Sequence, residues 1–233
     1  MSAPEAVGRC ADAEFVRRVA ALSLSPPEPF WREIFFRSAA ARGRSWDSLR
    51  SLGRRAYDCG RAYGRSLAPG GASPSELCRA AGLHVRALSA PPLPHMELFG
   101  LFDPPDSVFL RQDLLDRCDR YRSDSGLDAA LGPVRTGDVV LAHEYFHFLE
   151  ERDRKTIFTR THTEPSGLLG RRSHLPPLSE IAAMSFAQEL LGLHWTPLLL
   201  DCILLSLSDR RSAYSLLERL EGFAAETSGW PER

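Results

Sequence analysis

The chain has 233 residues, of which 43% are hydrophobic and 25% are charged. These proportions are typical of a globular protein with a sizeable core, and they exclude a disordered tail. The 29 basic and 30 acidic residues give a formal net charge of −1. Direct binding of nucleic acid through a surface coated with basic residues is therefore not expected.

Cysteine usage and hydropathy predict the cellular compartment of the protein. The five cysteines are scattered and form no CxxC pair, which predicts neither a disulfide framework nor a thiolate zinc site. This usage is typical of a reduced, cytoplasmic protein. The first ten residues, MSAPEAVGRC, lack the charged start and apolar run of a signal peptide. The most apolar stretch, residues 190–207, is interrupted by His194, Pro197 and Asp201, so we expect a buried helical hairpin and no membrane span.

Residues 1–44 are predicted to form an N-terminal helical extension. Two short apolar stripes, at residues 15–22 and 30–35, are separated by Pro26 and Pro27, which break a helix. Residues 1–66 hold 12 arginines and 7 acidic residues, a net charge of +5. This excess could belong to a basic arm that contacts nucleic acid, but it is more typical of a solvated helix face.

The next part of the chain is predicted to form two helices and three short strands. Ser45 and Ser73 are suited to cap the two helices. The sequence Asp103-Pro-Pro-Asp106 is a turn between the last two strands, because its prolines interrupt strand pairing. The predicted elements are helices 45–66 and 74–81 and strands 83–88, 98–102 and 108–111. The apolar face of the first helix is expected to comprise Leu49, Leu52, Ala56, Cys59 and Tyr63. Because the rest of the chain is mainly helical, we expect an α+β fold.

The segment His143-Glu144-Tyr145-Phe146-His147 has the pattern HExxH. An α-helix has about 3.6 residues per turn, so side chains four residues apart lie on one face. His143 and His147 are therefore predicted to bind one metal ion, with Zn²⁺ as the expected cofactor. Glu144 lies on the same face and is the expected catalytic base, which takes a proton from water acidified by the metal.

The context of the motif predicts the helix that it requires. Residues 138–151 contain neither Pro nor Gly, and several apolar side chains can face a core. These side chains are Val139, Val140, Phe146 and Leu149. The alternative is that His143 and His147 are ordinary half-buried histidines.

A zinc site needs a third protein ligand. The continuation HExxHxxGxxH is absent, since Glu150 and Asp153 stand where the glycine and the third histidine would be. Glu180, 33 residues after His147, lies in the predicted first turn of another helix and is the predicted third ligand, in a His₂Glu site. Two alternatives remain open. Glu180 could only complement the helix dipole, and Glu189 of the same helix is a rival carboxylate.

The helix that carries Glu180 has recognisable ends and a small-residue face. Ser179 is the predicted N-cap, and Gly192 is the predicted stop. Ala182, Ala183 and Ala187 permit close packing against another helix.

The segments AHEYFHFLE and EIAAMSFAQELL together resemble the ImmA/IrrE-type metallopeptidases. The upstream segments ELCRAAGLHVRAL and LFGLFDPPDSVFLR resemble the helix, strand and hairpin that precede the zinc helix in that family, so the resemblance covers roughly residues 45–207. It implies a compact, gluzincin-like zinc fold with His143, His147 and Glu180 as ligands and Glu144 as base. Members of that family often cut DNA-binding repressors, which implies a protein substrate.

The segment between the two motifs, residues 152–178, is basic and polar. Its cations could line a cleft for a peptide, and residues 156–159 could pair with that peptide as an edge strand; the alternative is a surface insertion. Its cations are Arg152, Arg154, Lys155, Arg160, Arg171 and Arg172.

Peptide hydrolysis also needs a group that stabilises the developing oxyanion. His162, His174 and Tyr121 are candidates, and the sequence does not choose among them. Tyr145 is less suitable, because it points off the metal face of the helix.

These observations combine into one prediction of organisation and function. Residues 1–44 form the helical extension, and residues 45–233 form a small zincin-like domain, mostly helical, with a short N-terminal β-sheet and HExxH on a central helix. Residues 197–223 contribute two packing helices to it. The predicted function is an intracellular zinc-dependent metallo-endopeptidase whose partner is a protein or peptide, such as a DNA-binding regulator. The alternative is a catalytically silent metal-binding or metal-free interaction module of the same fold.

Overall fold

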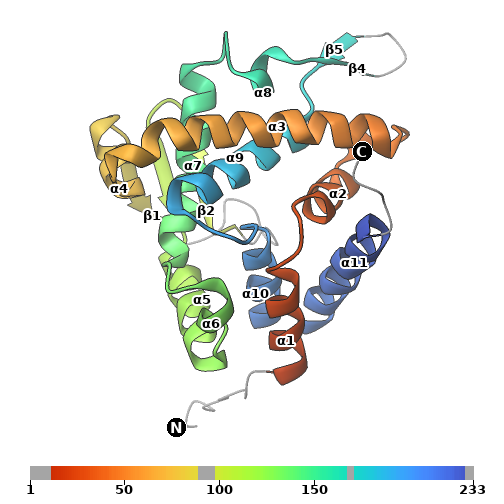
Figure 1. Cartoon of the computed structure of the whole chain (residues 1–233). Helices are drawn as coiled ribbons and strands as arrows, with labels where there is room; N and C mark the ends of the chain where they lie inside the picture. The colour runs from red at the N-terminus through yellow and green to blue at the C-terminus, as the bar shows by residue number, and fades with distance from the viewer. Residues whose placement is uncertain (1–11, 89–97, 167–170, 229–233) are drawn as a thin grey trace, which may run out of the picture.

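The computed structural model describes residues 12–88, 98–166 and 171–228 (Figure 1). Residues 1–11 of the predicted extension and residues 167–170 of the predicted basic loop lie outside the described residues. The described chain is mostly helical and carries a small three-stranded sheet, which confirms the α+β prediction at this level. Within it, no helix combines the length and the apolar character needed to cross a membrane.

The helices and strands predicted between residues 45 and 111 are present in the expected order, and further elements follow them. The α-helices are α1 (Ala13–Leu22), α2 (Glu28–Arg37), α3 (Trp46–Leu67), α4 (Pro74–Ala80), α5 (Gln112–Ser125), α6 (Asp128–Leu131), α7 (Thr136–Arg152), α8 (Phe158–Thr161), α9 (Pro176–Leu191), α10 (Leu199–Ser208) and α11 (Arg210–Ser228). The strands are β1 (His84–Ala87), β2 (Gly100–Asp103), β3 (Ser107–Leu110), β4 (Glu164–Ser166) and β5 (Arg171–Ser173). The Ser45 and Ser73 caps are confirmed, because their side chains accept backbone N–H groups of α3 and α4.

The three-stranded sheet has the order β1-β3-β2, with β3 parallel to β1 and antiparallel to β2. β2 and β3 form the predicted hairpin, in which Phe102 pairs with Val108. β2 is therefore an edge strand of this sheet, and it packs against α7. The HExxH helix thus lies beside a short edge strand. A separate antiparallel pair consists of β4 and β5.

The long helix α3 packs closely along α9 (Figure 1). At Gly60 the backbones come so near that an added Cβ atom would lie 2.0 Å from the carbonyl oxygen of Ala182. Gly64 allows a similar approach one turn later. Ser185 of α9 also donates a hydrogen bond to the carbonyl oxygen of Tyr57 on α3, at 2.9 Å. The predicted small-residue contact of α9 is confirmed, and its partner is the glycine face of α3.

The helix α7 is surrounded by α4, α5, α9, β2 and β3. The predicted core residues Val139, Val140, Phe146 and Leu149 are buried. Tyr145 is buried as well and packs against Phe148 and Phe186, away from the two histidines.

The start of α7 is held by α5. The carboxylate of Asp119 accepts the backbone N–H of Thr136 at 2.9 Å, which satisfies one of the open donors at the helix N-terminus. The buried Arg122 donates hydrogen bonds to the carbonyl oxygens of Gly132 (2.6 Å) and Val134 (2.7 Å) in the segment that leads into α7. These contacts determine where the HExxH helix begins.

The N-terminal helices α1 and α2 lie beside the C-terminal helix α11 (Figure 1). Arg18 of α1 binds Glu221 of α11 through two hydrogen bonds of 2.8 and 2.7 Å. Arg219 of α11 binds both carboxylate oxygens of Glu33 on α2, at 2.9 and 2.7 Å. α10 and α11 confirm the two packing helices predicted for residues 197–223.

The prediction of an edge strand at residues 156–159 was wrong. Phe158–Thr161 forms the short helix α8, and the strands of this region are β4 and β5. Ile157 and Thr159 are buried, with 2% and 3% exposure, and the carbonyl of Ile157 accepts the N–H of Thr161 at 3.0 Å. Burial of these side chains favours a helical turn whose backbone groups bond internally.

The α3–α9 contact yields a prediction about stability. Gly60→Ala should lower the free energy of unfolding by about 3 kcal/mol, because the new methyl group overlaps the backbone of α9. Gly222→Ala on α11 is the control, since a Cβ there meets nothing within 4 Å. The control should raise stability by up to about 1 kcal/mol through helix propensity. Urea unfolding of both variants measures the difference, and equal effects would contradict the close contact.

Candidate metal centre

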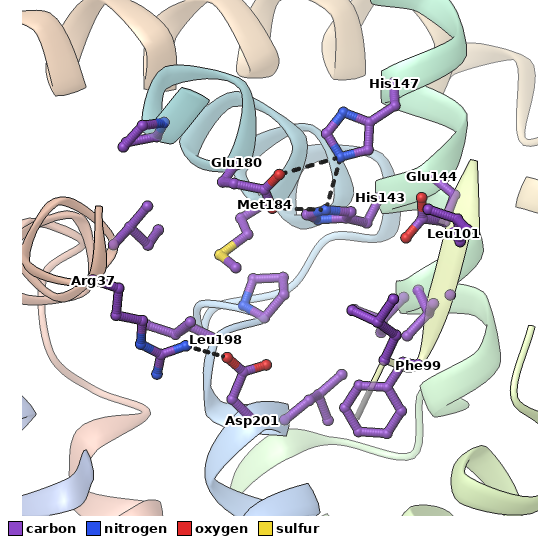
Figure 2. A pocket seen from close by; sticks show the side chains of 18 of the residues that line it. Arg37, Phe99, Leu101, His143, Glu144, His147, Glu180, Met184, Leu198 and Asp201 are labelled. Carbon is purple, nitrogen blue, oxygen red and sulfur yellow. Dashed lines mark hydrogen bonds and ion pairs between the residues drawn. The ribbon is translucent and has the colours of Figure 1, made fainter. Parts of the chain in front are cut away.

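The two histidines of α7 and Glu180 of α9 come together in one cluster (Figure 2). The Nε2 atoms of His143 and His147 are 3.1 Å apart. One oxygen of Glu180 lies 3.3 Å from Nε2 of His143, and the other lies 3.7 Å from Nε2 of His147. One potential ligand atom from each residue lies within 4.8 Å of the others. The structure therefore brings the three predicted ligand residues together.

The helix that carries Glu180 begins earlier than predicted. Pro176 and Pro177 occupy the first positions of α9, where a helix needs no N–H donor. Ser179 is therefore inside the helix, and its prediction as the N-cap was wrong. Glu180 lies in the second turn, and the first turn holds no acidic residue. Because the dipole effect falls off within the first turn, complementing the dipole does not account for Glu180.

The charges of the cluster shift two pKa values in opposite directions. Burial by itself would raise the pKa of Glu180, but the hydrogen bond and charge of His143, together with the charge of His147, lower it to about 2. Burial would lower the pKa of His147, but the hydrogen bond to Glu150 and two further carboxylates raise it to about 9. This surplus of carboxylates around His147 favours a bound cation.

Behind the cluster, Glu150 orients the ring of His147. Its Oε2 lies 2.9 Å from Nδ1 of His147, which leaves Nε2 facing Glu180. The same oxygen accepts hydrogen bonds from the hydroxyl of Ser179 and from Arg160. Glu150 is fully buried, and although burial raises its pKa, the contacts with His147 and Ser179 bring that pKa below its usual value. A carboxylate on the second ring nitrogen is the usual partner of a metal-binding histidine.

The role of Glu150 is not among the predictions made from the sequence. Helical spacing carried the signal, because a residue three positions after His147 lies on the same face of the helix. Ser179 is a helix cap in the sequence-based prediction, whereas in the structure its hydroxyl donates a hydrogen bond to the buried carboxylate of Glu150.

Glu144 lies beside the ligand cluster, on the side of β2 (Figure 2). Its Oε2 accepts the backbone N–H of Phe102 at 2.8 Å, and its side chain is largely buried. Gly100 permits this approach of strand and helix, because a Cβ there would lie 2.7 Å from Cγ1 of Val140 and 3.1 Å from Oε1 of Glu144. The carboxylate is thus held next to the histidines by the backbone of an edge strand.

The cluster borders two cavities. The larger one, of about 830 Å³, is lined by the cluster and Glu144 and continues along β2 to α2, α10 and α11. The smaller one, of about 320 Å³, reaches His147 and Glu180 as well, and His174 lines its wall. Phe102 contributes to both cavities. A molecule that extends from one cavity into the other would therefore pass the ligand cluster.

The rival carboxylate Glu189 lies elsewhere. Its Oε2 is 2.5 Å from Nε of Arg61, and its side chain lies against Gly64 on the α3 side of α9. It lines neither of the two cavities. Among the carboxylates of α9, Glu180 is thus the one that joins the histidines.

The three candidates for oxyanion stabilisation lie in different places. Tyr121 packs edge-on against Phe15 and borders neither cavity. Nε2 of His162 pairs with Glu164 at 2.7 Å. His174 lines the smaller cavity beside the cluster. The structure therefore places only His174, of these three, on a cavity wall next to the cluster.

The basic segment contributes part of the wall of the smaller cavity, through Thr159, Arg160, His174, Leu175 and Pro176. Among its described side chains, Arg160 lines the smaller cavity and binds Glu150 at 3.3 Å. Arg152 pairs instead with Asp153 at 2.8 Å, and Arg154 pairs with Glu151 at 3.1 Å. Two of the six predicted cleft cations, Arg152 and Arg154, are thus paired with neighbouring carboxylates at the surface.

The cluster predicts metal binding that depends on Glu180. We expect the purified chain to hold one zinc ion, and Glu180→Gln to weaken zinc binding by more than about 100-fold, because a ligand is lost. Competition with a chromophoric chelator measures both affinities. Glu189→Gln, the same change on the same helix, should leave zinc affinity unchanged; equal losses in the two variants would contradict the assignment.

The hydrogen bond from Glu150 predicts a second effect on metal affinity. Glu150→Gln preserves shape but removes the charge that orients His147, so zinc affinity should fall by about 10–100-fold. The same chelator competition measures it, and circular dichroism verifies folding. Glu151→Gln is the neighbouring control. Unchanged affinity in the Glu150 variant would show that this carboxylate is only structural.

No protein-family model, no curated protein and no solved structure matches the chain. The chemical interpretation therefore rests on the side chains themselves. They form a cluster of two imidazoles and one carboxylate, with a further carboxylate beside it and another behind it.

Proposed function

We propose that the chain is a zinc-dependent metallo-endopeptidase with a gluzincin-like fold and the ligands His143, His147 and Glu180. The observation that carries this proposal is the convergence of these side chains beside Glu144 on the wall of a large cavity. Two imidazole nitrogens and one carboxylate oxygen suit zinc and match the ligand set of catalytic sites with an open position.

When bound, zinc supplies Lewis acidity, which polarises a carbonyl group and lowers the pKa of water. Glu144 is the proton carrier of the reaction. It accepts the proton of the attacking water and delivers it to the nitrogen of the cleaved amide. The N–H of Phe102 keeps this carboxylate beside the cluster and out of the ligand positions.

The edge strand β2 is suited to hold an extended peptide. The N–H of Phe102 points away from β3 and is taken by Glu144, which shows that the free edge of β2 faces the cluster. By the alternation of an antiparallel ladder, Gly100 directs its backbone groups the same way. A substrate that adds to this edge as a strand has its backbone along the cavity and across the cluster. This arrangement favours a peptide over a compact small molecule.

The resemblance of the two motif segments to the ImmA/IrrE-type metallopeptidases supports a protein substrate, such as a DNA-binding regulator. The described cysteines are free, which supports the reducing cytoplasm as the site of action; they are Cys59, Cys78, Cys118 and Cys202. Direct contact with nucleic acid has less support, because arginines of α3 already pair with carboxylates. Arg54 binds Glu28 and Arg61 binds Glu189.

The alternative function is a catalytically silent module of the same fold. Within the described residues, no fourth side chain joins His143, His147 and Glu180 in the cluster, and the large cavity reaches it. A structural zinc site is closed by four protein ligands. The three-residue cluster and its access to the cavity therefore favour a catalytically active site over a silent one.

The mechanism predicts that a substitution of Glu144 abolishes hydrolysis without abolishing metal binding. Glu144→Gln should retain zinc but hydrolyse peptides at least about 100-fold more slowly, because the proton carrier is lost. Cleavage of a quenched fluorescent peptide library by the zinc-loaded proteins measures the rates. Undiminished cleavage by the variant would contradict the mechanism. A zinc-loaded wild type that cleaves no peptide would favour the silent module.

A further inference from the structure

The larger cavity has a second polar end, distant in sequence from the HExxH motif. Arg37 of α2 and Asp201 of α10 form an ion pair there, with Nη1 of Arg37 2.9 Å from Oδ2 of Asp201. Figure 2 shows this pair across the cavity from the two histidines. Much of the wall is apolar, with Ile34, Phe99 and Met184 among its residues.

The contacts of this pair show which of the two side chains can still bind a further group. Nε of Arg37 binds Glu33 at 2.8 Å, and Nη1 binds Asp201. Within the described residues, Nη2 of Arg37 makes no hydrogen bond. The side chain of Arg37 is 40% exposed and lines the cavity. A planar guanidinium with an unused nitrogen is suited to a carboxylate.

The carboxylates around Arg37 are otherwise occupied. Glu33 is fully buried and also accepts two hydrogen bonds from Arg219. Both of its carboxylate oxygens are therefore already hydrogen-bonded. Asp201 is partly buried, and burial raises its pKa although Arg37 opposes that effect. Burial opposes the charge of Arg37, but the carboxylates of Asp201 and Glu33 outweigh it and raise its pKa. Burial therefore disfavours the charge of Asp201, whereas the neighbouring carboxylates favour the charge of Arg37.

We propose that this end of the cavity is a substrate subsite in which Arg37 binds a carboxylate, while the apolar wall contacts the segment between that carboxylate and the cluster. The inference rests on the proposed peptidase function and names its substrate class. Peptides with a carboxylate on the segment that enters this cavity are preferred. That carboxylate belongs either to the C-terminus or to an acidic side chain.

The test is a comparison of matched peptides binding to the full chain. The protein is the Glu144→Gln variant loaded with zinc, so that peptides bind without turnover. The first pair is acetyl-Leu-Leu-Ala as the free acid and as the amide. The second pair, both amides, ends in Glu or in Gln. Isothermal titration calorimetry should give about tenfold tighter binding of the carboxylate member in at least one pair. The pair that responds identifies the source of the carboxylate.

Two further substitutions should shift this preference in opposite directions. Arg37→Gln should abolish it, and Asp201→Asn should strengthen it by removing a competing carboxylate. Arg211→Gln, an exposed arginine of α11, is the control for the change in net charge. Because Arg219 still satisfies Glu33, Arg37→Gln should fold, which circular dichroism verifies. If that variant does not fold, Asp201→Asn alone decides the result.

Several outcomes would overturn the inference. The first is equal affinity for the two members of each peptide pair, and the second is no measurable binding of any peptide. The third is a preference for the carboxylate that persists in Arg37→Gln or does not increase in Asp201→Asn. The outcomes are distinct from failure of the peptidase proposal. A chain that hydrolyses peptides without this preference remains a peptidase but lacks the subsite. A chain that shows the preference but neither binds zinc nor hydrolyses peptides would support the subsite and contradict the peptidase proposal.

Discussion

The close contact between α3 and α9 is the constraint on which the site depends. Gly60 has no side chain, so the backbone of α9 at Ala182 can lie against it, and Ser185 then bonds to the backbone of α3. Glu180 lies within one helical turn of Ala182, so the position of its carboxylate is linked to this contact. A wider spacing between α3 and α9 would move the carboxylate relative to His143 and His147.

Three glutamates around the two histidines have different environments and therefore different chemistry. Glu150 is fully buried behind His147 and fixes the orientation of its ring. Glu180 faces both imidazoles and completes the donor set. Glu144 is held by a backbone N–H of β2, outside that set. Burial and hydrogen-bond partners, rather than residue type, thus distinguish the three glutamates to which we assign the orienting, ligand and proton-carrier roles.

The helices at the two ends of the chain connect this cluster with the rest of the cavity. α2, α10 and α11 are joined through Glu33, which binds Arg37 and Arg219, and through the pair of Arg37 with Asp201. The same network that holds these helices together places Arg37 and Arg219 on the wall of the cavity. The charged residues that pack the chain ends are therefore also those of the proposed subsite.

The sequence by itself determined the features that depend on local spacing. The HExxH pair, the capped helix around Leu49 and Leu52, and the hairpin around residues 103–106 all follow from periodicity and turn chemistry, and the structure has them. Only the tertiary structure decided that α9 begins at Pro176, that Gly60 faces Ala182, that Glu150 serves His147, and that Arg37 shares a cavity with the cluster. Two of these, the Gly60–Ala182 contact and the cavity shared by Arg37 and the cluster, depend on residues far apart in the chain. Local periodicity carries no information about which distant segment will pack against a given helix face.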